Sequence, residues 1–249
     1  MSWAAGFVDA VSWLVLYHVY TSHMTGNTAS LALETARDEW QQAWHHGWVI
    51  LPFFAGLLYS AATTKAARRH GFHSSFAIAL VTELLLLFAF IVFGSHWLRG
   101  RQPAIPGGLA GYLLVSLPAA AMGVQTVTVT RINGLRVYTT YLTGSLTKCS
   151  EALVDYGFWL YDRTRARNRK RFISAFRISL RQRSVQHALL TAGLWLGFFS
   201  GAVCGVIAEN RFSLLALCAP MAVIAAAAAV DLVLPVAAAD EPDSADSAH

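Results

Sequence analysis

The chain has 249 residues, of which 55% are hydrophobic and only 13% are charged. A soluble domain carries about 25% charged residues, so this composition argues against a soluble protein and favours a membrane protein. The net charge of +5 does not indicate nucleic acid, because most of the positive charge lies in one block, Arg163–Arg183, between two apolar runs.

Several apolar runs are each about as long as the roughly 20 residues that cross a bilayer. They barely show the polar face of a soluble amphipathic helix. An apolar segment also starts at the N-terminus, without the basic residues that open a signal peptide. We therefore expect an all-α, polytopic bundle of transmembrane helices, built around the runs Trp48–Thr64, Ser75–Gly94, Leu109–Thr130, Ala188–Ala208 and Phe212–Val236.

A polar segment, Val19–Leu31 (VYTSHMTGNTASL), interrupts the apolar start of the chain. Its glycine, Gly26, weakens a helix by about 1 kcal/mol relative to alanine. Broken backbone at membrane depth is tolerated only where it is buried in protein or lines a wet cavity. The segment therefore predicts a broken helix or a re-entrant hairpin.

The same pattern returns in the second half of the chain. Val137–Cys149 (VYTTYLTGSLTKC) aligns with the first segment without a gap, and FFAG at Phe53–Gly56 matches FFSG at Phe198–Gly201. A turn signal, Asn133-Gly134, precedes the second copy. Internal similarity of this kind predicts two membrane repeats, residues 1–98 and 105–235, with a basic cytoplasmic insertion at about 156–184 in the second; residues 236–249 would form a disordered acidic tail.

Charge predicts the direction of each repeat. Basic residues at Lys65–Arg69 follow one span, and Arg163–Arg183 precedes another, so both should face the cytoplasm. The two halves then have opposite orientation. This predicts six spans as two inverted three-span repeats, in the bacterial cytoplasmic (inner) membrane with both termini cytoplasmic. Counting each motif segment as two spans gives eight crossings, but it places the basic block outside.

Inverted halves with interrupted helices are typical of secondary transporters, whose broken helices meet near the midplane and bind the substrate. Arg131 could hold an anion or pair with an acidic residue. The alternative is that threonine and glycine only allow close helix packing. The substrate-binding set predicted for an unknown small solute is Thr21, His23, Thr25, Gly26, Asn27, Gln125, Arg131, Thr139, Thr143 and Gly144.

Ionisable residues inside spans are costly and usually functional, so Asp9 and Glu83 are the predicted ion-coupling groups. For Glu83 the alternative is a structural carboxyl kept neutral by burial. His23 could move protons or act only as a hydrogen-bonding spacer.

Other features predict packing and membrane contacts. Gly197, Gly201 and Gly205 form a small-residue stripe that could join helices within one protomer or in a homo-oligomer. Apolar residues at helix spacing within the basic insertion indicate an amphipathic helix on anionic lipid heads, rather than a nucleic-acid site. No catalytic or metal-binding motif is present, so we expect neither an enzyme nor a cofactor.

Four segments, GFVDAVSWL, SHMTGNT, FFAG and MGVQTVTVTRINGLRVYTTYLTGSLTK, resemble the YoaK-like family of bacterial membrane proteins, a family of unknown function. The resemblance runs from Gly6 to about Leu234 and implies an integral inner-membrane protein without naming a substrate. The leading hypothesis is a small-solute transporter or permease. The alternatives are a non-transporting scaffold or partner-binding subunit and, more weakly, a membrane enzyme for which no nucleophile stands out.

Overall fold

A computed structural model describes residues 1–70, 76–97, 108–127, 130–132, 135–137, 142–164 and 183–233. Most of the basic block and the acidic tail lie outside these residues, as do Thr139 and Thr140. The elements in chain order are α1 (Ser2–Val15), α2 (Met24–Ala36), α3 (Trp40–Trp48), α4 (Ile50–Arg69), α5 (Ala77–Trp97), α6 (Leu109–Val127), β1 (Thr130–Ile132), β2 (Leu135–Val137), α7 (Leu142–Thr164), α9 (Arg183–Phe212), the 3-10 helix η1 (Ser213–Leu217) and α10 (Cys218–Val233).

The described chain is helical apart from one short hairpin. β1 and β2 pair antiparallel with Arg131 opposite Arg136, on either side of the predicted Asn-Gly turn. Four helical stretches are long and apolar enough to cross a membrane: Trp40–Ala67, Ala77–Trp97, Leu109–Val127 and Ala188–Val233. The last of these contains both α9 and α10. The prediction of a helical, membrane-like protein is confirmed.

The outer surface of the bundle suits hydrocarbon. Its exposed side chains include Leu85, Phe88 and Phe93 on one helix and Leu196 and Phe199 on another. Exposed hydroxyl groups on the helices donate to carbonyl oxygens within the same helix: Thr28 to Met24, Thr35 to Leu31, Thr63 to Tyr59 and Thr82 to Ile78. Such back-bonding satisfies these four hydroxyl donors where they face lipid.

Two pairs of helices touch backbone to backbone through glycine. A Cβ at Gly6 of α1 would overlap the carbonyl oxygen of Phe198 on α9, and one at Gly201 of α9 would overlap the carbonyl oxygen of Trp3. Gly205 faces Phe7 in the same contact. The predicted glycine stripe is therefore used inside the chain, where the absent side chains let α1 and α9 approach closely. A homo-oligomer through these glycines stays a prediction.

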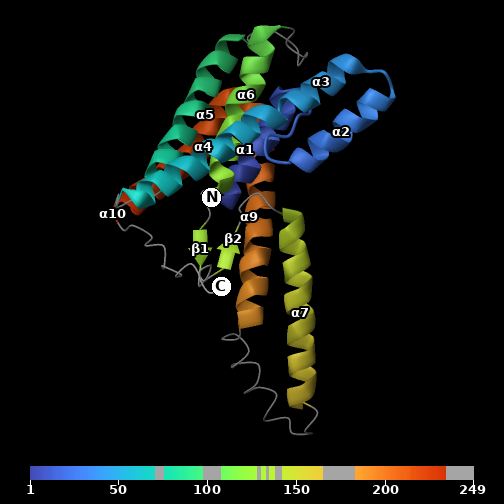
Figure 1. Ribbon diagram of the computed structural model, residues 1–249, viewed down its shortest axis with the longest axis vertical. Coiled ribbons are helices and arrows are strands. Elements are labelled where there is room, and N and C mark those ends of the chain that lie inside the picture. Colours follow the sequence, from blue (N-terminus) through green and yellow to red (C-terminus); the bar gives the residue numbers. More distant parts are fainter. Residues whose placement is uncertain are drawn as a thin grey trace, which may run out of the picture.

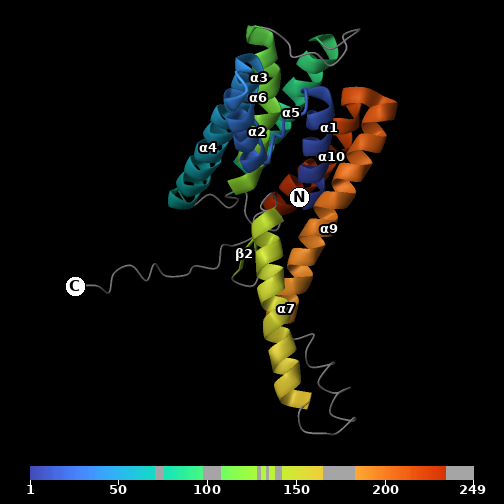
Figure 2. The same cartoon turned by 90° about the vertical axis from the view of Figure 1, so that its right-hand side faces the viewer.

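The second contact joins α4 and α6. A Cβ at Gly56 would overlap the carbonyl oxygen of Ala120, and a Cβ at Gly123 would overlap that of Phe53. α5 packs beside α6 and α10 (Figures 1 and 2). The core between these helices is filled by Phe7, Leu87, Phe90, Met122 and Leu217.

Six of the helices run alternately in opposite directions along the chain, whereas α7 runs in the same direction as α6 (Figure 2). α1, α5 and α9 run toward one end of the bundle, whereas α4, α6 and α10 run toward the other, as the colour gradient shows (Figures 1 and 2). α2 and α3 form a helical hairpin, and α3 continues into α4 (Figure 1). α7 lies along the N-terminal part of α9, where the Sγ atom of Cys149 is 3.9 Å from the carbonyl oxygen of Ala188.

Candidate functional site

Asp9 is the centre of a buried polar cluster on α1. Its side-chain oxygen Oδ1 accepts hydrogen bonds from the backbone N–H groups of Thr21 and Ser22, both at 2.8 Å, and from the Thr21 hydroxyl at 3.0 Å. Asp9 is only 3% exposed. A buried carboxylate requires such partners, so Asp9 holds the segment after α1 against the helix that precedes it.

The local backbone explains how that segment returns to Asp9. α1 ends at Val15, and the next residues include Tyr17 and His18 with φ angles of 57° and 62°. Left-handed conformations cost non-glycine residues about 1–3 kcal/mol each. The hydrogen bonds to Asp9 offset this cost, because bonds to a charged group contribute about 1.5–3 kcal/mol each. The predicted break in the first helix is therefore a chain reversal anchored on one carboxylate.

His23 completes the cluster. Its Nδ1 atom lies 2.7 Å from Asp9 Oδ2 and 3.0 Å from the Ser22 hydroxyl oxygen. An ionised carboxylate only accepts hydrogen bonds, so Nδ1 carries the proton and Nε2 is the atom left for other partners. Burial by itself lowers the pKa of the imidazole, but the hydrogen bond to Asp9 and the charge of Asp9 raise it above its ordinary value of 6.5.

Asn27 has a structural role in the first motif. Its amide group donates to the carbonyl oxygen of Tyr20 at 2.6 Å and accepts from the Tyr20 N–H at 3.2 Å. The side chain is fully buried. Thr21 and Asn27 were predicted to contact a substrate; in the structure they hold the polar turn together, so their polar atoms are already paired.

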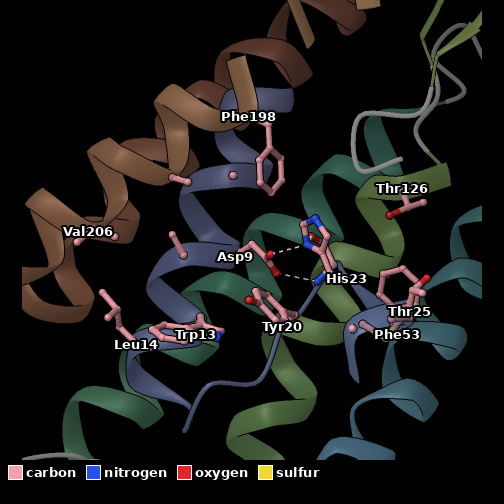
Figure 3. A pocket seen from close by; sticks show the side chains of 16 residues that line it. Asp9, Trp13, Leu14, Tyr20, His23, Thr25, Phe53, Thr126, Phe198 and Val206 are labelled. Carbon is pink, nitrogen blue, oxygen red and sulfur yellow. Dashed lines mark hydrogen bonds and ion pairs between the residues drawn. The ribbon is translucent and has the colours of Figure 1, made fainter. Parts of the chain in front are cut away.

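A cavity of about 1260 Å³ opens beside the pair formed by Asp9 and His23. Figure 3 shows these two side chains facing each other, with Phe198 of α9 and Thr126 of α6 on different sides. The rings of His23 and Phe198 meet edge to face, with their centroids 5.3 Å apart. The cavity is lined by Gly6, Asp9, Ala10, Trp13, Leu14, Tyr20, Ser22, His23, Met24, Thr25, Gly26, Phe53, Thr126, Phe198, Ala202 and Val206.

Some of the predicted site residues line this cavity. Thr25 and Gly26 do, at the start of α2. Gln125 is buried near the end of α6, next to the lining residue Thr126. Gly144 lies in the first turn of α7 and does not line this cavity. The side chains of Arg131 and Thr143, like Thr139, lie outside the described part of the chain.

Glu83 is separate from this cavity. It is completely buried on α5, and neither of its carboxyl oxygens has a hydrogen-bond partner among the described residues. Its coupling role stays a prediction. No group of three or more metal-ligating side chains occurs within the described ranges.

Sequence reasoning missed the aromatic wall of the cavity. Trp13, Tyr20, Phe53 and Phe198 all line it. The repeated Phe-Phe pair was recognised as a sign of duplication, and it was also a signal for the site, because each copy places one phenylalanine in the cavity. Tyr20 lies in the repeated polar motif, but the motif was read for its threonine, glycine and asparagine residues, and Trp13 looked like any aromatic residue of an apolar helix.

The fold and the site define a helical membrane protein with a carboxylate–histidine pair beside a cavity between its helices. Residues 1–230 match the family described as "Protein of unknown function (DUF1275)", and the chain belongs to this family. It is 26% identical over 147 residues to the UPF0700 transmembrane protein YoaK of Bacillus subtilis (strain 168). That alignment covers 59% of this chain and 61% of the relative's length. No solved structure matches the chain. The predicted resemblance to the YoaK-like family is confirmed.

Proposed function

We propose that this protein is a small-solute transporter or permease of the bacterial cytoplasmic membrane, and that the cavity beside Asp9 and His23 is its central site. The observation that carries the proposal is the position of this cavity. It lies between helices from both halves of the chain, with Phe53 from the first half and Phe198 from the second in its wall. Ligand sites in membrane bundles are built at such junctions.

The glycine contacts support a duplicated architecture for this transporter. Trp3 and Gly6 are three positions apart, as are Ala120 and Gly123, and the same spacing separates Phe53 from Gly56 and Phe198 from Gly201. In each half the first helix meets the second helix of the other half through these positions. The contact of α1 with α9 is thus repeated by the contact of α6 with α4. Two copies of one unit produce such a matched pair of contacts when they pack around a common axis.

Helix directions support six crossings in two inverted repeats. In the first half α1, α4 and α5 alternate in direction, and α6, α9 and α10 alternate in the opposite sense (Figures 1 and 2). In this scheme the hairpin of α2 and α3 is re-entrant. The basic residues after α4 and before α9 then share the cytoplasmic side with both termini.

A short helix that begins inside the bundle is the expected transporter element. The first residues of α2 line the cavity, and the segment that precedes them is bound to Asp9 near the middle of α1. Broken backbone at membrane depth is tolerated where it lines a water-filled cavity. A scaffold has no need for an open volume of this size at its centre, so we propose a transporter rather than a scaffold or an enzyme.

Uptake into proteoliposomes tests the proposal. A panel of small cations, anions and neutral solutes is offered to wild type and to Gly26→Leu, which adds a bulky side chain at the cavity. Gly157→Leu is the matched control, because nothing lies within 4 Å of a Cβ at that position on α7. We expect at least one solute whose uptake falls about tenfold or more in Gly26→Leu only, because the leucine side chain would occupy space in the cavity that the solute needs. Equal uptake by both variants and wild type for every solute would overturn the role of the cavity.

A further inference from the structure

The geometry of the cavity points to its ligand class and its coupling ion. Resting on the transport role proposed above, we propose that the cavity binds an apolar organic ammonium ion in exchange for one proton, and that the Nε2 atom of His23 carries this proton. As the ammonium ion enters with its own charge, the proton leaves Nε2 to solvent, so the net charge of the cavity is unchanged. Asp9 is then a positioning residue and a fixed counter-charge.

Asp9 cannot itself be the carrier that meets the ligand. Four donors converge on its two oxygens: two backbone N–H groups, the Thr21 hydroxyl and the His23 ring. Three of these donors act on Oδ1, and the His23 ring acts on Oδ2. A proton on Asp9 would remove the negative charge that strengthens all four hydrogen bonds, whereas the accessible nitrogen of the His23 ring takes a proton without breaking any of them.

His23 is the group that reaches the cavity. Its side chain is 33% exposed, compared with 5% for that of Asp9. Because Nδ1–H is held by Asp9, Nε2 is either a bare acceptor or, after protonation, a donor. Among the described residues, none forms a hydrogen bond with Nε2. A neutral His23 therefore offers an acceptor that suits an N–H of an ammonium group.

The cation and the proton compete for the cavity because each adds one positive charge beside Asp9. The titratable side chains lining the cavity are Asp9, Tyr20 and His23, whereas α4, α6 and α9 contribute only uncharged groups to its described lining. His18 lies behind this wall, packed on Trp13. With His23 neutral, the full negative charge of Asp9 exceeds the roughly half positive charge at the start of α2. A cation is then favoured, and protonation of His23 removes that preference.

The walls favour an apolar body on this cation. Aromatic rings of Trp13, Tyr20, Phe53 and Phe198 can attract a cation through their faces. Few free polar groups remain, because the Ser22 hydroxyl contacts His23 and the Thr126 hydroxyl donates to the carbonyl oxygen of Met122. A sugar or a zwitterionic amino acid would lose its hydration without finding partners. The volume of about 1260 Å³ accepts a body as large as a drug molecule.

Equilibrium binding with two probes of one shape and opposite charge tests the charge preference. Tetraphenylphosphonium and tetraphenylborate are each measured against the full chain in nanodiscs, with empty nanodiscs as the background. We expect the cation to bind at least about tenfold more tightly than the anion in alkaline buffer, and this ratio to fall as the pH is lowered and His23 takes up a proton. In a second measurement, in weak acidic buffer where His23 is protonated, we expect release of about one proton per bound cation, followed with a pH-indicator dye. Equal or tighter binding of the anion would overturn the proposal.

Variants separate the proton site from the fixed charge. His23→Gln keeps a hydrogen-bond donor for Asp9, so it should bind the cation with an affinity that no longer falls in acidic buffer. Ala202→Trp, in the cavity wall, should abolish binding, whereas Ala222→Trp on the exposed face of α10 should not. Persistent acid inhibition in His23→Gln would refute the assignment of the proton to His23.

The two proposals fail in different ways. If uptake of some neutral or anionic solute depends on Gly26 while the cation probe does not bind, the transport role stands and the ligand class is wrong. If the cation binds with proton release but no solute is transported, the site is real and the transport role is wrong.

Discussion

At the scale of single residues, one carboxylate explains the shape of the first motif. Asp9 accepts hydrogen bonds from the backbone N–H groups of Thr21 and Ser22, and its contact with Nδ1 fixes the tautomer of His23. The sequence indicated that Asp9 was functional because a charge in a span is costly. It could not show that Asp9 contacts His23, because that contact requires the chain reversal at Tyr17 and His18, where non-glycine residues adopt positive φ angles.

The pair of His23 and Asp9 makes stability depend on pH. The pKa of folded His23 is raised above its ordinary value of 6.5, so the folded state binds the proton more tightly than the unfolded state. This stabilisation is fully present below about pH 6.5 and is lost as the pH rises through the folded value. We expect wild type to exceed His23→Gln in melting temperature by more in acidic buffer than in alkaline buffer.

Thermal unfolding in detergent, followed by tryptophan fluorescence, measures this difference. The matched control is His96→Gln, at the end of α5 and remote in sequence from the cluster. Its difference from wild type should not follow the same pH trend. A gap between wild type and His23→Gln that is constant with pH would contradict the proton linkage.

At the scale of elements, the apolar runs predicted the long helices well. The run Trp48–Thr64 falls within the stretch Trp40–Ala67, and Ser75–Gly94 overlaps α5. A helix surrounded by lipid and core is apolar on every face, so its apolar residues show no helical period. Its composition and length are therefore enough to locate it. The short elements were harder to predict. α2 is too short and too polar to be read as a span, and α3, although it belongs to the stretch Trp40–Ala67, lies almost wholly outside the apolar run that begins at Trp48.

Glycine positions set the distance between helices, and this gives a prediction for packing. Gly6→Val should lower stability strongly, because the new side chain would overlap the backbone of α9 at Phe198. Overpacking in a tight contact costs about 1–3 kcal/mol, and here the obstacle is backbone, which cannot rotate away. The measurement is the melting temperature and the monodisperse fraction on size-exclusion chromatography in detergent.

Gly193→Val on α9 is the control for this substitution. Nothing lies within 4 Å of a Cβ at Gly193, so the same change in side chain meets open space. Valine also has a somewhat better helix propensity than glycine. Comparable losses in Gly6→Val and Gly193→Val would mean that propensity, not the contact of α1 with α9, determines the effect.

At the scale of the whole molecule, the repeat in the sequence and the exchanged glycine contacts agree. Sequence similarity located the two motifs and the two Phe-Phe pairs, but it could not show which helices would touch. The two halves contribute different charges to the cavity. Asp9 contributes a charge from α1, whereas the corresponding stretch of α6, which also carries the close-packed glycine, contributes the neutral Thr126. One charged pair for the whole cavity fits exchange of a single proton.

The number of crossings is open to a direct test. With six crossings, two of them lie between Lys65 at the end of α4 and Arg183 at the start of α9, so both positions face the same side. With eight crossings an odd number separates them, and they face opposite sides. The difference rests on α7, which lies between α6 and α9 along the chain and is not among the four described stretches that are long and apolar enough to cross a membrane.

Single cysteines at Lys65, Arg183 and Glu39 decide between the two, after serine replaces the native Cys149, Cys204 and Cys218. A membrane-impermeant maleimide added to intact cells should label only the cysteine at Glu39, in the turn between α2 and α3. Permeabilisation should then expose Lys65→Cys and Arg183→Cys together, because basic segments are retained in the cytoplasm. Labelling of just one of these two in intact cells would establish an odd number of crossings between them, and the inverted three-span repeat would be wrong.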